Sequence, residues 1–177
     1  RTFTGAVGVA GNRIALVTAS GSEADAFRTC SPGVRVIDCT GRLLMPGLVD
    51  GHTHTCQQLL RGRVSDEYPM VWTRFLVPFE SNLRPEDSYI SGQLACLEMI
   101  KNGTTSFADS GGVHMERVAD AVLESGMRAA IAKSTMDMGN AITGAMKETA
   151  EEAVNHTREL YQAYDGKGDG RISIWFA

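Results

Sequence analysis

From residue 46 to its last residue, the chain alternates between strand-like and helix-like sequence patterns. The strand patterns end at four residues: His54, Asp109, Ser134 and Ala177. The helix patterns cover about 85–101, 115–124 and 145–164, and a glycine follows each of them closely. Strands that alternate with helices in this way form parallel βα units, so the pattern predicts an α/β fold with a parallel sheet.

The number of strands limits which α/β fold this can be. A (β/α)₈ barrel needs eight strands and about 250 residues, and this stretch supplies four strands. We therefore interpret it as the first half of a TIM-like barrel and the chain as a fragment of a larger protein. The alternative is an open doubly wound sheet, which is disfavoured because no glycine-rich phosphate loop follows the first strand. A half-barrel leaves a parallel edge open, so we expect residues 1–177 alone to fold poorly and to lack activity.

The first 45 residues have the character of β structure. Two hairpins are expected, one pairing 6–9 with 13–17 and the other pairing 34–38 with 42–45. The polar stretch 18–32 is expected to be a loop with one weak helical turn. We therefore predict two domains, 1–45 and 46–177. In the first helix of the second domain, the expected buried stripe is Ile90, Leu94, Leu97 and Ile100.

Two histidines, His52 and His54, stand at the end of the first strand of the second domain. Residues i and i+2 of a strand point to the same face, so the two imidazoles can meet at one point. Imidazole is a common ligand of zinc and similar metals. Such a pair can also lie in a surface loop or in a core where the backbone satisfies both rings. The apolar run before Asp50 favours a buried strand that reaches a polar rim, and hence a metal site.

Residues 46–54 (PGLVDGHTH) resemble the first metal-binding strand of the amidohydrolase superfamily. The stretch 59–62 (LLRG), Trp72 and 78–80 are similar to the branch of S-adenosylhomocysteine, methylthioadenosine and guanine deaminases and triazine chlorohydrolases. The resemblance implies a TIM-like barrel preceded by part of a small β-sandwich. It also implies one divalent metal, zinc or alternatively iron, with His52 and His54 as two of its ligands. The other ligands and all catalytic residues would come from the missing C-terminal half of the barrel.

The implied activity is hydrolysis of an amino group from a small heterocyclic substrate such as a purine, a pterin or a nucleoside. A divalent metal with an open position acidifies bound water, which can then attack the ring carbon. An alternative within the enzymes is a chlorohydrolase of a triazine-like ring. The remaining alternative is a half-barrel that binds metal without catalysis or serves as a scaffold.

Four residues are candidates for substrate binding: Glu80, Trp72, His114 and Lys133. Glu80 matches a glutamate that contacts sugar hydroxyls in related enzymes, although it could also begin a helix. Lys133 matches an arginine in some nucleoside deaminases, and its lack of a bidentate fork disfavours an S-adenosylhomocysteine-like substrate. Asp109 either orients a metal-binding histidine or caps a loop.

Composition limits the partners and the location of the protein. The net charge is -4 without runs of like charge, so we expect no nucleic-acid or membrane partner. No apolar stretch approaches the ~18 residues of a membrane span. The four cysteines lack CxxC spacing, which favours reduced thiols in the cytoplasm. We expect a cytoplasmic homo-oligomer.

Overall fold

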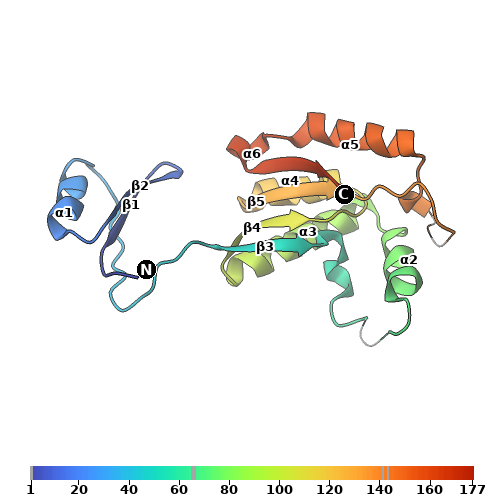
Figure 1. The fold of residues 1–177 in the computed structure, drawn as a ribbon, viewed down its shortest axis with the longest axis horizontal. Coiled ribbons are helices and arrows are strands. Elements are labelled where there is room, and N and C mark those ends of the chain that lie inside the picture. The colour runs from blue at the N-terminus through green and yellow to red at the C-terminus, as the bar shows by residue number, and fades with distance from the viewer. Residues whose placement is uncertain (1, 65–66, 141, 143) are drawn as a thin grey trace. The chain divides into compact units, whose positions relative to one another are not determined.

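The computed structural model describes residues 2–64, 67–140, 142 and 144–177. The chain divides into two compact units, 1–45 and 46–177 (Figure 1). Among the described residues, no helix combines the length and the apolar character that crossing a membrane requires.

The first unit contains one antiparallel hairpin and one helix. Strand β1 (Ala6–Ala10) pairs with β2 (Arg13–Thr18), which confirms the first predicted hairpin. The prediction of a loop over 18–32 is wrong, because helix α1 covers Gly21–Thr29. The Ser20 hydroxyl accepts a hydrogen bond from the Glu23 amide at 3.3 Å and so caps the helix N-terminus.

The second predicted hairpin, 34–38 with 42–45, is not formed. Its turn exists, since the Arg42 amide donates to the Cys39 carbonyl at 2.9 Å, but neither flanking segment is a strand. Val36 and Ile37 are 66% and 68% exposed. An isolated strand pair is marginal in water unless one face is covered, and these side chains have no cover within the unit. The assignment of 1–45 to part of a β-sandwich stays a prediction.

The second unit is built on a four-stranded parallel sheet. Its strands are β3 (Leu48–Thr53), β4 (Thr104–Asp109), β5 (Arg128–Lys133) and β6 (Ile172–Phe176). They lie side by side in chain order, and every pairing is parallel (Figure 1). The predicted parallel sheet is therefore confirmed. All four carboxyl ends meet at one edge, where α/β enzymes place their chemistry.

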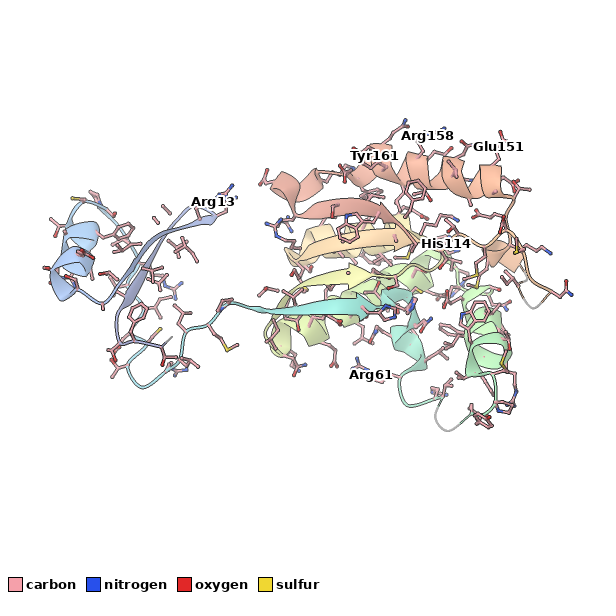
Figure 2. The ribbon with its side chains drawn as sticks, viewed as in Figure 1. Arg13, Arg61, His114, Glu151, Arg158 and Tyr161 are labelled. Atoms are coloured by element: carbon pink, nitrogen blue, oxygen red, sulfur yellow. The ribbon has the colours of Figure 1, made fainter. Side chains whose placement is uncertain are left out.

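Three long helices connect these strands: α3 (Pro85–Lys101), α4 (Met115–Ser125) and α5 (Ala150–Tyr164). The first two match the predictions closely. Helix α5 begins later than predicted, because Thr149 and Glu152 form a capping box in which each side chain accepts from the other's backbone amide. A separate 3₁₀ turn, Gly144–Met146, precedes it. Figure 2 shows Glu151, Arg158 and Tyr161 on the outer side of α5.

Besides Gly144–Met146, the described residues of this unit form four shorter helical segments. They are the 3₁₀ helix η1 (Thr55–Leu60), the π-helix η2 (Trp72–Leu76), α2 (Val77–Glu80) and α6 (Lys167–Gly170). Segment η1 directly follows β3 and packs on α3, so the chain after the two histidines turns back onto the helical layer.

The core lies between the sheet and the helices. It contains Phe107 and Ile131 from the strands and Met115, Val118 and Val122 from α4. The predicted stripe of α3 is wrong, since Ile90, Leu97 and Ile100 are each half exposed. The buried face of α3 consists instead of small residues: Ser88, Ser91, Gly92, Ala95 and Cys96. Small side chains let α3 and α4 approach closely, and the Ser91 hydroxyl on this face donates to the Thr55 carbonyl at 2.6 Å.

Candidate functional site

The two histidines lie next to one another at the carboxyl end of β3. Their ring centroids are 5.2 Å apart and their planes are 85° apart. The side chain of His52 is exposed and that of His54 is half-buried. The two rings therefore have the adjacency that their i, i+2 spacing predicts. The binding of a metal by these rings stays a prediction.

Each ring is held through its Nδ1 atom. His54 Nδ1 lies 2.9 Å from the carbonyl oxygen of Gly111, and His52 Nδ1 lies 2.8 Å from the hydroxyl of Ser110. Among the described residues, no hydrogen bond reaches Nε2 of either ring. A metal-binding histidine usually donates its other ring N–H to such an oxygen, which orients the ring. Both histidines therefore have an oxygen partner at Nδ1, and the convergence of their Nε2 atoms on one ligand stays a prediction.

Asp109 organises the loop that supplies these contacts. Its buried carboxylate accepts hydrogen bonds from the Gly111 amide at 3.1 Å, the Thr55 amide at 3.2 Å and the Thr55 hydroxyl. Burial raises the pKa of Asp109 to about 6, although the bonds from Thr55 and Gly111 and the nearby His54 lower it. Asp109 therefore caps this loop, and it holds Gly111, whose carbonyl oxygen faces the His54 ring.

Gly111 needs to be glycine in this loop. Its φ is +102°, a conformation that side chains disfavour, and an added Cβ would lie 2.7 Å from the Ser134 amide nitrogen. The close approach of these two segments places the Gly111 carbonyl at the His54 ring.

A shallow cavity of about 510 Å³, widely open to solvent, adjoins the histidines. Its lining residues are His52, Thr53, His54, Gln57, Gln58, Leu60, Arg61, Gly62, Val64, Val71 and Leu76. One part of the lining carries amide, guanidinium and imidazole groups, and the rest is aliphatic. A flat polar heterocycle needs this combination, because hydrogen bonds fix its orientation while apolar contacts exclude water.

Glu80 lies behind this cavity rather than on its lining. The side chain is 3% exposed, and its carboxylate accepts a hydrogen bond from the side-chain amide of Gln57. Burial raises the pKa of Glu80, while the bond from Gln57 and the charge of His54 lower it. A substrate in the cavity would therefore meet Gln57 first. The substrate contact of Glu80 stays a prediction.

Arg61 lines the cavity, and it was not among the predicted site residues. Its guanidinium pairs with Glu98 of α3 at 2.9 Å and donates to the Gln58 side chain at 2.8 Å. The 59–62 motif was the available signal for this residue. There was less reason in the sequence to place Gln57 and Gln58 at the site. They belong to no motif and only follow His54 closely along the chain.

Trp72 and His114 do not reach the cavity lining. Trp72 begins η2 and is 41% exposed. His114 is the N-cap of α4 with φ of +55°, and its Nε2 lies 3.0 Å from the Leu83 carbonyl oxygen. That contact ties the loop before α4 to the loop before α3. As substrate contacts, both residues stay predictions.

Lys133 is also absent from the cavity lining. Its ammonium group forms an ion pair with the Glu148 carboxylate and donates to the Ser134 carbonyl at 3.0 Å. A substrate anion would have to compete with Glu148 for this charge.

The described residues of this chain offer an incomplete ligand set for a metal. Within 2–64, 67–140, 142 and 144–177, no group of three or more His, Cys, Asp or Glu side chains could hold an ion. A zinc site needs three or four protein ligands. The histidine pair fits as two of them.

The amidohydrolase family model matches residues 43–177. The chain belongs to the amidohydrolase family. A 5-methylthioadenosine/S-adenosylhomocysteine deaminase of Pelotomaculum thermopropionicum is 42% identical over 173 residues, which cover 97% of this chain and 37% of that protein. A 5'-deoxyadenosine deaminase of Methanosarcina acetivorans is 38% identical over 80% of this chain and 31% of its own length. The chain therefore spans about a third of the length of these curated relatives.

Solved structures of the family share the fold. An adenosine deaminase of Xanthomonas campestris with bound zinc matches with a TM-score of 0.64 and 30% identity, over 75% of this chain and 29% of that one. A guanine deaminase of C. acetobutylicum with bound guanine matches with the same TM-score and 21% identity, over 75% and 32% of the two chains. At 21% identity, the match to the guanine deaminase shows only that the two proteins share a fold.

Proposed function

We propose that this chain is the N-terminal part of a metal-dependent aminohydrolase that deaminates a purine nucleoside. The four parallel strands would form the first half of a (β/α)₈ barrel. Two facts support this proposal. The chain corresponds to 37% of a deaminase to which it is 42% identical, and within the described residues the two outer strands of the sheet, β3 and β6, pair on one side only.

The anchoring of both histidines through Nδ1 is the observation that carries the proposal. Ser110 and the Gly111 carbonyl engage the Nδ1 atoms, so both Nε2 atoms remain for a shared ligand. Zinc is the proposed ion, since a 30% identical adenosine deaminase carries it. When bound with an open position, zinc lowers the pKa of water and supplies a nucleophile at neutral pH.

The protein's own residues would bind and orient the substrate. The aliphatic part of the lining, which includes Leu60 and Leu76, would cover the ring faces and keep bulk water out. Gln57 would present an amide to the polar edge, with Glu80 behind it. Because Glu148 already neutralises Lys133, we propose a nucleoside without a carboxylate tail as the substrate.

An ammonia-release assay on the full-length protein tests this proposal. Adenosine, 5'-deoxyadenosine, guanine and a pterin would be compared before and after removal of metal and after addition of zinc. We expect turnover of an adenosine derivative that chelation abolishes and zinc restores. A zinc-loaded protein that releases no ammonia from any of these compounds would instead favour a scaffold.

A further inference from the structure

We infer that Ser110 is a positioning residue for His52, and this inference rests on the proposed function, in which His52 binds the metal. The serine hydroxyl would accept a hydrogen bond from Nδ1–H of His52. The ring would thereby be held with Nε2 unprotonated and available to the metal.

The backbone places Ser110 beside the histidine pair. The Ser110 amide donates to the carbonyl oxygen of Thr53 at 2.9 Å, and Thr53 separates the two histidines. The preceding residue, Asp109, is paired in register with Thr53. The end of β4 is thus fixed against β3, and the Ser110 hydroxyl lies 2.8 Å from His52 Nδ1.

The chemistry of imidazole defines what this hydroxyl does. A neutral imidazole carries one N–H, and the nitrogen that binds a metal must be the other one. A hydroxyl can donate or accept, so it can hold either tautomer in the free protein. When Nε2 binds the metal, Nδ1 carries the proton and Ser110 accepts from it. Such a partner orients the ring and raises its basicity.

His52 depends on a side chain, whereas His54 does not. The Gly111 carbonyl that faces His54 Nδ1 is backbone and can only accept a hydrogen bond. His54 is also half-buried, while His52 is exposed and has less packing to hold its ring. A substitution of Ser110 can therefore remove the Nδ1 contact of His52 while the Nδ1 contact of His54 stays intact.

The test compares metal binding by the full-length protein and by its Ser110→Ala and Ser110→Thr variants. Zinc affinity is measured by competition with a chromophoric chelator, and the visible spectrum of the cobalt-substituted protein reports the ligand field. We expect Ser110→Ala to weaken zinc binding by about 10- to 100-fold and to alter the cobalt spectrum. Ser110→Thr keeps a hydroxyl and should retain both properties.

Ser106→Ala is the matched control. Ser106 lies within β4, four positions before Ser110, and makes no hydrogen bond to either histidine in the described part of the chain. The Ser106→Ala variant should bind zinc with the affinity of the unsubstituted protein.

The outcomes separate this inference from the proposed function. If the unsubstituted protein binds no zinc, the proposed function is wrong. If it binds zinc and Ser110→Ala does so with equal affinity and an equal cobalt spectrum, the function stands and the positioning role is overturned. Equal weakening in the alanine and threonine variants would also overturn the role, because the hydroxyl would then not be the active group.

Discussion

Replacing Gly112 with alanine should destabilise the second unit by overpacking. An added Cβ would lie 2.3 Å from the Cys56 sulfur and 3.3 Å from the Met115 sulfur. Cys56 is fully buried and Met115 is 1% exposed, so neither can turn into solvent. The φ of Gly112 lies outside the left-handed range, so the expected effect is steric.

The close contact with Cys56 places this substitution among the overpacking changes of known size. Forcing an extra methyl group into a packed core costs about 1 to 3 kcal/mol. In the double variant Gly112→Ala, Cys56→Ala, the 2.3 Å contact disappears but a 3.3 Å contact with the Cys56 Cβ remains. The double variant should therefore recover part of the loss, with a coupling energy of about 0.5 to 3 kcal/mol.

Urea unfolding of the metal-free full-length protein and its variants measures these free energies. Gly51→Ala on β3 is a suitable control, because a Cβ there meets no atom within 4 Å. The reasoning would be refuted by a Gly112→Ala variant as stable as the parent, or by single-variant costs that simply add in the double variant.

Three further predictions concern other parts of the chain. Thr149→Ala removes the capping box of α5 and should lower the free energy of unfolding by about 1 kcal/mol; an unchanged value would show that the cap is dispensable. Burial raises the pKa of the Cys56 and Cys96 thiols, so both should stay unmodified when the folded protein is briefly alkylated. Peptide mapping measures the labelling, and rapid labelling of either cysteine would contradict the structure. Glu80→Gln should reduce kcat/KM with little change in melting temperature; a large fall in melting temperature with intact kcat/KM would make Glu80 a structural residue.

Strands and helices of the second unit were predictable where local signals agree. Helix α3 begins at Pro85, and Gly103 follows two residues after its end. The local sequence therefore specifies both ends of this helix. The buried face of α3 was not predictable in this way. Ile90 and Leu97 match an apolar stripe, but which face is buried depends on α4, whose approach the local pattern does not contain.

In the first unit and at the site too, features that depend on the local sequence were predictable, and features that depend on distant parts of the chain were not. The segments around Thr40 have strand character, yet pairing requires a covering surface that the local sequence does not specify. The His52 and His54 pair followed from the period of a strand. The Ser110 contact joins residues that are 58 positions apart, and nothing in the sequence marks that serine.

The central claim is that His52 and His54 bind one metal ion. The most direct measurement is the zinc content of the full-length protein and of its His52→Ala, His54→Ala double variant, purified in parallel. His156→Ala is the control, since His156 lies on α5 and bonds to Glu148 instead. We expect bound zinc in the parent and the control and its loss from the double variant. Unchanged zinc content in a folded double variant would contradict the claim.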